Sequence, residues 1–253
     1  MFILRRLILL LLPVIWFAGL AMIKSDHRCL WWVVAVFFVY LLVAVWQTCK
    51  GQINKAFFHF LILPILFGVA SFIFVLFLVS PLAFYGVSAL SALVLYFLLK
   101  QYFIYFNFPF KYQPYSLESL TFYICLLLFY FLFSSSFAGL ILLKLNIFFI
   151  IAVFCPMAGL VIYQFFWIHK LSLKQSWIFV LVLPLVLLEL FVAVSYLPTN
   201  YYVNGFFLTI ACYLMLGLSR ASLNKTLNKN QLISYLVVAS VLSLATFLSA
   251  QWN

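Results

Sequence analysis

The chain has 253 residues, of which 69% are hydrophobic and only 7% are charged. So few polar side chains cannot cover a surface that faces water, which excludes a soluble globular protein and predicts an integral membrane protein. The net charge of +11 would suit nucleic acid, but the basic residues are spread two or three to a connection, so no nucleic-acid partner is expected.

Apolar runs of about 20 residues predict membrane-spanning helices, because every backbone amide in hydrocarbon must be satisfied within the chain. The expected fold is all-α: one polytopic helical bundle over residues 1–253, with about nine transmembrane helices and no soluble domain. The predicted spans are 2–23, 29–46, 56–79, 82–99, 120–143, 147–168, 177–197, 201–218 and 232–250.

The first span has a second interpretation. "MFILRRLILLLLPVIWFAGLA" places Arg5-Arg6 before an apolar stretch, and Gly19-Leu20-Ala21 resembles the cleavage site of a signal peptide. The apolar start of the segment favours a retained span. Whether residues 1–21 are a span or a signal peptide stays open.

"KSDHR" follows the first span and is a strongly polar cluster. It places Asp26, His27 and Arg28 on the outer side of the predicted topology. A solvated turn is the simpler interpretation, and a share in an outer polar site is the alternative.

Two connections in the middle of the chain are distinctive. Ser80-Pro81 predicts a tight hairpin, because a single helix over 56–99 would be about 66 Å long, roughly twice the hydrocarbon thickness. Residues 100–119 are rich in aromatic residues and prolines, and they are expected to lie in the cytoplasmic interface. Ser116 is then a candidate N-cap and Glu118 a first-turn acid, a structural role.

Glu189 interrupts the apolar run of the seventh span. It lies about 18 Å along the helix from Trp177, in the outer half of the predicted span. A carboxylate at that depth costs a few kcal/mol, so it must take up a proton, find a partner or face water. A hydrogen bond to a neighbouring helix is the structural alternative to a functional role.

Helical spacing extends the polar character beyond Glu189 into "PTNYYVNG". The candidate outer site therefore contains Glu189, Tyr196, Asn200, Tyr201, Tyr202 and Asn204, together with Asp26, His27 and Arg28 if the first and seventh spans are close. Gly205 is interpreted as a turn residue before the eighth span.

Basic residues predict the orientation. With nine spans, 11 of the 14 share the side of the N-terminus: Arg5, Arg6, Lys50, Lys55, Lys100, Lys111, Lys170, Lys174, Arg220, Lys225 and Lys229. The positive-inside rule then places the N-terminus in the cytoplasm and Asn253 outside the cell membrane. Six of the seven tryptophans fall at predicted helix ends, as the interface favours, and only Trp16 lies deeper.

Cysteine and histidine show no metal-binding pattern. The five cysteines lie on different spans without a C-x-x-C pair, and the three histidines lack ligand spacing. No cofactor, haem or metal is expected.

The stretches "ELFVAVSYLPTNYYVNG" and "GLSRASLNK" resemble an uncharacterised family of small polytopic membrane proteins from candidate-phyla bacteria. The resemblance is strongest over about the last 90 residues, mainly 188–225. It implies no chemistry for Glu189 or for the residues that follow it.

Three functional hypotheses remain. The first is a carrier, flippase-like or lipid-handling protein that binds a lipid or small molecule at a polar site toward the outer face. The second is a scaffold or accessory subunit that docks to another membrane protein. The third is an enzyme acting on a lipid-linked substrate, which the five-residue loop around Asp26 makes the weakest.

Overall fold

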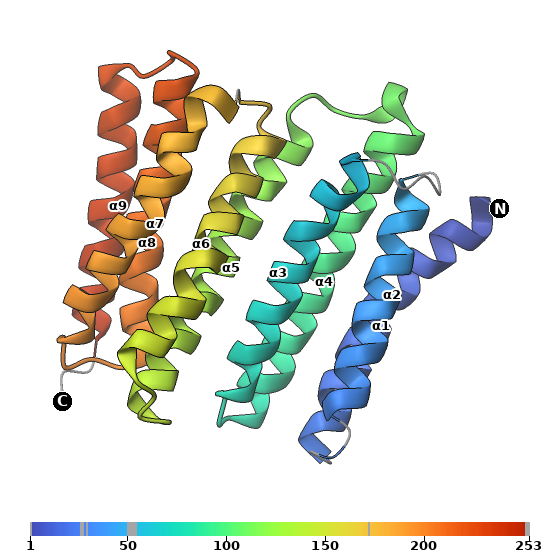
Figure 1. The fold of residues 1–253 in the computed structure, drawn as a ribbon, viewed down its shortest axis with the longest axis horizontal. Helices are drawn as coiled ribbons and strands as arrows, with labels where there is room; N and C mark the ends of the chain where they lie inside the picture. Colours follow the sequence, from blue (N-terminus) through green and yellow to red (C-terminus); the bar gives the residue numbers. More distant parts are fainter. Residues whose placement is uncertain (1, 26–27, 29, 50–54, 172, 251–253) are drawn as a thin grey trace. The chain divides into compact units, whose positions relative to one another are not determined.

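The computed structural model describes all residues except 1, 26–27, 29, 50–54, 172 and 251–253. In the described part the chain is helical and contains no strand (Figure 1). Its helices are α1 (Phe2–Ser25), α2 (Leu30–Thr48), α3 (Lys55–Leu76), α4 (Pro81–Asn107), the short 3-10 helix η2 (Pro109–Lys111), α5 (Ser116–Ile141), α6 (Ile147–Ile168), α7 (Leu173–Ser195), α8 (Tyr201–Leu223) and α9 (Lys229–Ser249).

The helices are those of a multi-pass membrane protein. Eight of them, α2 to α9, have the length and apolar composition to cross a bilayer, and α1 contributes a shorter apolar stretch, Ile8–Lys24. The prediction of an all-α fold with about nine long helices is therefore confirmed for the described residues.

The fourth helix differs from its predicted span at its end. α4 continues to Asn107, where the sequence predicted an end at residue 99. Its last turns pack against Phe60 of α3, whose ring centroid lies 4.7 Å from that of Tyr102 and 4.9 Å from that of Phe106. The helix ends at Asn107 because Phe108 precedes Pro109 and is disfavoured in helical conformation. Much of the predicted interfacial segment is therefore helix.

The hairpin predicted at Ser80-Pro81 is present. α3 ends at Leu76, and Pro81 begins α4 with Ser80 at the N-cap. Proline suits the first helical position because its fixed φ matches the helix and its missing N–H would have no partner there.

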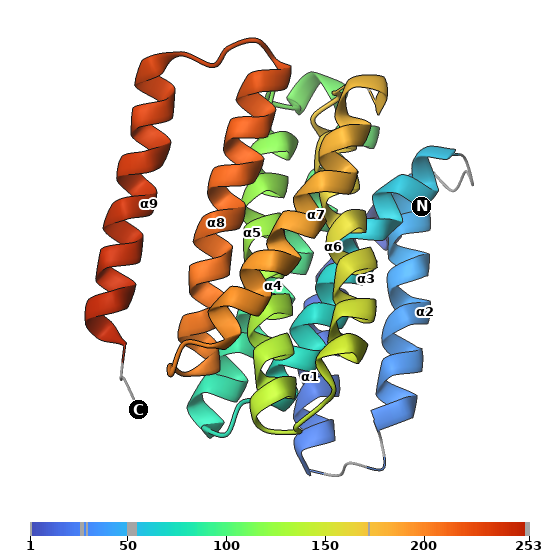
Figure 2. The same cartoon turned by 60° about the vertical axis from the view of Figure 1, so that its left-hand side comes forward.

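The chain divides into two compact units, residues 1–124 and 125–253. In the first unit, α1 packs against α4 and α2, and α3 packs against α4 and α2. In the second, α6 packs against α7, α7 against α8 and α8 against α9, and Figure 2 shows α8 and α9 as an antiparallel hairpin.

Phe191 of α7 stacks on Phe137 and Phe154 in the core of the second unit, at 4.4 and 5.7 Å between ring centroids. The single bundle stays a prediction.

Candidate functional site

Glu189 lies on the outer surface of α7. Its side chain is exposed, as are those of Val182 and Leu185 on the same side of the helix. The opposite side of α7 is buried and includes Leu187 and Phe191. Among the described residues, no hydrogen-bond or ion-pair partner faces the carboxylate of Glu189. The acid therefore lies away from the core of its unit.

Tyr196 and Asn200 follow the end of α7 at Ser195 and are also exposed, Tyr196 to 82%. The segment turns there, because Pro198 cannot continue the helix and the Leu197 N–H bonds the carbonyl of Val194 at 3.0 Å. The predicted polar stripe is thus broken between Ser195 and Asn200.

The next polar residues face the interior of the second unit instead. Tyr201 and Asn204 are buried near the start of α8, and the hydroxyl of Thr199 donates a hydrogen bond to Oδ1 of Asn204. The hydroxyl of Tyr201 donates to that of Tyr202 at 2.5 Å. These bonds link residues close in sequence, so "PTNYYVNG" has a structural role at the start of α8.

The interpretation of Gly205 as a turn residue is wrong, because Gly205 lies inside α8, which begins at Tyr201. A Cβ atom built on Gly205 would lie 2.9 Å from the backbone nitrogen of Ser134 and 3.0 Å from its Cα. Glycine is required here because α8 and α5 approach closely at this point.

The remaining candidate residues belong to the first unit. Asp26 and His27 lie outside the described residues, and Arg28 is exposed. The proximity of this cluster to Glu189 stays a prediction.

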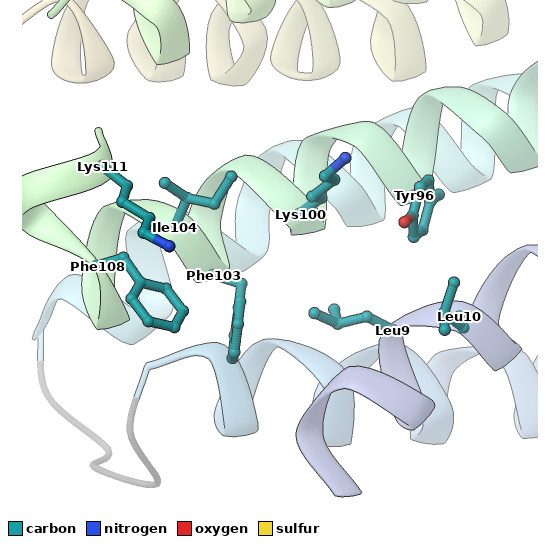
Figure 3. Close-up of a pocket in the computed structure, with 8 residues that line it drawn as sticks. All are labelled: Leu9, Leu10, Tyr96, Lys100, Phe103, Ile104, Phe108 and Lys111. Atoms are coloured by element: carbon teal, nitrogen blue, oxygen red, sulfur yellow. The ribbon is translucent and has the colours of Figure 1, made fainter. Parts of the chain in front are cut away.

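A pocket with a different chemistry lies in the first unit, between α1 and α4 (Figure 3). Its volume is about 350 Å³. Its lining consists of Leu9, Leu10, Tyr96, Lys100, Phe103, Ile104, Phe108 and Lys111. We call this pocket the α1–α4 groove.

A bend of α1 at Pro13 lies next to the groove. Figure 1 shows that the first turns of α1 are set at an angle to the rest of the helix. Proline has no N–H to donate and its ring clashes with the carbonyl of residue i−4, here Leu9, which bends a helix. Leu9 and Leu10 lie just before this bend and line the groove on the side of α1.

The charges of the groove have one sign. Figure 3 shows Phe103 and Tyr96 extending from α4 toward the side of Leu9, and Lys111 beside Phe108. The ammonium of Lys111 lies 5.7 Å from the ring centroid of Phe108, and that of Lys100 lies 5.9 Å from the ring of Tyr96. Both lysines are exposed, and none of the described residues that line the groove is Asp or Glu. Apolar walls beside two cations suit an amphiphile with an anionic head.

Metal-binding groups are dispersed in the described part of the chain. No three His, Cys, Asp or Glu side chains there lie close enough together to hold a metal ion.

Residues 13–249 match the model of a family described as a protein of unknown function, DUF5656. The chain belongs to the DUF5656 family. The prediction of an uncharacterised family is confirmed, and the DUF5656 match extends well beyond 188–225. The bacterial source implied by the resemblance stays a prediction. Neither a curated protein nor a solved structure matches the chain.

The DUF5656 match includes Glu189 and both lysines of the groove and begins at Pro13. From the sequence, Lys100 and Lys111 indicated only the orientation of the chain and were not predicted to form a site. The sequence contained a signal, because Tyr96, Lys100 and Ile104 recur every four residues, and positions with this spacing are neighbours on a helix surface.

Proposed function

We propose that this protein handles a lipid with an anionic phosphate head, which it binds in the α1–α4 groove at the cytoplasmic side of the cell membrane. The observation that carries the proposal is the pairing of two lysines with a wall of leucine and aromatic side chains in one pocket. The proposal moves the lipid-handling hypothesis from the predicted outer site to a groove that the predicted topology assigns to the cytoplasmic side.

The two parts of such a lipid fit the two parts of the groove. Lys111, beside Phe108, would attract the phosphate, and Lys100, whose side chain leaves α4 on the side away from Leu9 in Figure 3, would add to the positive potential. A lysine close to an anionic membrane surface contributes about 1 kcal/mol. The acyl chain would lie against Leu9, Phe103 and Ile104, where apolar contact is favourable. The sequence adds Arg5 and Arg6 one helical turn before Leu9 and Leu10.

The predicted orientation supports the same reading. Lys100 and Lys111 belong to the 11 basic residues on the side assigned to the cytoplasm, with Asn253 outside. Anionic lipids give the cytoplasmic leaflet its negative surface potential. Lys100 and Lys111 would therefore lie at the cytoplasmic leaflet, where anionic lipids are available to bind.

Movement of the bound lipid across the bilayer, as in a flippase or carrier, would be a further step. The outer residues around Glu189 give that step little support, because Glu189, Tyr196 and Asn200 are exposed whereas Tyr201 and Asn204 are buried. The exposed acid favours the second hypothesis, an accessory subunit with a membrane partner.

Native mass spectrometry of the detergent-purified protein tests the proposal, with added phosphatidylglycerol or phosphatidylcholine of the same chain length. The phosphate of phosphatidylcholine is balanced by its choline, so we expect preference for phosphatidylglycerol. Replacing both lysines, Lys100→Gln with Lys111→Gln, removes about 2 kcal/mol and is expected to weaken binding about 30-fold.

The matched control is the pair Lys144→Gln and Lys170→Gln, two exposed lysines of the second unit. Binding should be unchanged in this control. An unchanged affinity in the groove variant, or equal binding of the two lipids by the wild type, would contradict the proposal. Competition by inorganic phosphate at millimolar concentration would show that the site recognises the free ion instead.

A further inference from the structure

The exposed side of α7 carries an acid on an apolar surface. Ile178, Val182 and Leu185 are each about half exposed and lead along the helix to Glu189 and Ala193, which are also exposed. These five residues are spaced three or four apart and share one side of the helix. We call this surface the Glu189 face.

The depth of Glu189 makes this exposure costly. α7 has 23 residues, about 35 Å at 1.5 Å per residue, and Glu189 lies six residues, about 9 Å, before its end at Ser195. A charged side chain inside the hydrocarbon costs a few kcal/mol. This depth depends on the helix alone and holds for either orientation of the chain.

Glu189 cannot easily reach water along its own helix. Side chains on a helix lean toward its N-terminus, whereas the nearest interface to Glu189 is at the C-terminal end of α7. The short Glu side chain therefore points back into the hydrocarbon. Within the second unit the buried side of α7 already packs through Leu187 and Phe191, so the core leaves the Glu189 face uncovered.

We propose that the Glu189 face docks a transmembrane helix of another membrane protein, which brings a Lys, Arg or His side chain to the carboxylate. Charge complementarity selects this occupant, because an opposite charge offsets the cost of an acid in hydrocarbon. A second copy of the chain fits less well. In the predicted topology, the basic residues and histidine on that side are Lys24, His27, Arg28 and Lys144, all near the ends of predicted spans or in connections.

Photo-crosslinking of the full chain in its native membranes tests this inference. A photoreactive amino acid replaces Leu185 on the Glu189 face, and a control chain carries it at Leu244, an exposed position on α9. We expect the Leu185 position alone to capture a membrane protein, at a helix with a basic residue in its apolar stretch. Glu189→Gln and Glu189→Leu should each reduce capture at least ten-fold, while size exclusion and thermal unfolding stay unchanged.

Charge reversal makes the test specific. Glu189→Lys should abolish capture, and replacing the partner's basic residue with Glu should restore it. Capture that persists in Glu189→Leu, or a partner helix without a basic residue, would overturn the inference. So would adducts confined to lipid, to residues 1–124 of the same chain or to a second copy. The inference does not depend on lipid binding in the α1–α4 groove, because the two sites lie in different units.

Discussion

At the scale of single residues, Glu118 shows how an acid is accommodated without a functional role. It lies in the first turn of α5, where the helix dipole favours a negative charge, and it is only 5% exposed. The hydroxyl of Tyr112 donates a hydrogen bond to its Oε2 at 2.9 Å. The predicted placement of Glu118 is confirmed, but α5 begins at Ser116 itself, so this residue is not the N-cap.

Tyr112→Phe should lower the free energy of unfolding by about 1 to 2 kcal/mol, because the buried carboxylate of Glu118 loses a donor. Burial, and then the bond to Glu118, raises the pKa of Tyr112 above its usual value. A raised pKa means that this contribution is fully present below the unfolded pKa of about 10 and is lost as pH rises through the folded pKa.

Thermal unfolding in detergent at pH 7 and pH 11 measures this difference. The gap between wild type and Tyr112→Phe should be present at pH 7 and smaller at pH 11. Tyr115→Phe is the control, because Tyr115 is 70% exposed and should unfold like wild type at both pH values. An equal gap at both pH values would show that the bond to Glu118 does not depend on the phenol proton.

At the scale of helices, the close approach of α5 and α8 depends on Gly205. Gly205→Ala places a methyl group against the backbone of Ser134, which cannot move without shifting α5. We expect a loss of about 1 to 3 kcal/mol in thermal unfolding. Gly86→Ala in α4 is the control, because no atom lies within 4 Å of its added Cβ, and it should be neutral or slightly stabilising. Equal stability of the two variants would contradict the close approach.

The bend at Pro13 is expected to open the α1–α4 groove. Pro13→Ala restores a backbone donor, straightens α1 and should reduce retention of phosphatidylglycerol in native mass spectrometry about as much as loss of one lysine, roughly five-fold. Pro156→Ala in α6 removes a comparable helical proline from the second unit and should leave lipid retention unchanged. Full retention by Pro13→Ala would show that the groove does not need the bend.

The sequence predicted the existence of the helices better than their ends. Each predicted span overlaps one of the long helices in the described part of the chain, because apolar runs of about 20 residues match the thickness of a bilayer. The end of α4 was missed because its last turns, "QYFIYFN", resemble an interfacial segment until Phe60 provides a packing surface. The prediction of a turn at Gly205 was also wrong because it lacked a tertiary contact: only the approach of Ser134 shows that Gly205 packs inside a helix.

At the scale of the whole molecule, pairing of the helices could not be predicted. In a membrane, side chains that face lipid and side chains that face the core are both apolar, so the pattern that reveals a buried side in a soluble helix is weak. In the sequence, Trp16 is distinguished only by its depth within the predicted span. Its ring nitrogen donates to Ser91 Oγ at 2.9 Å, a bond across the packed pair of α1 and α4 that no local signal indicates.

The candidate site shows the same limit. The sequence singled out Glu189 because an acid in an apolar run is rare, and the structure adds that its side chain is exposed and faces no described partner. In the sequence, Lys100 and Lys111 indicated only the orientation of the chain. The structure adds that apolar side chains of α1 and α4 line the same groove as the two lysines. The orientation itself, with Asn253 outside, stays a prediction.

The most direct test of lipid binding in the α1–α4 groove is photolabelling of the purified protein in nanodiscs with a phosphatidylglycerol that carries a diazirine in its acyl chain. We expect labelled peptides to concentrate on residues 8–14 of α1 and on residues 96–108 at the end of α4 and just after it, and this enrichment to disappear in the Lys100→Gln, Lys111→Gln variant. Labelling spread evenly over all the helices, and unchanged by the two substitutions, would show only general contact with the bilayer and would contradict the proposed function.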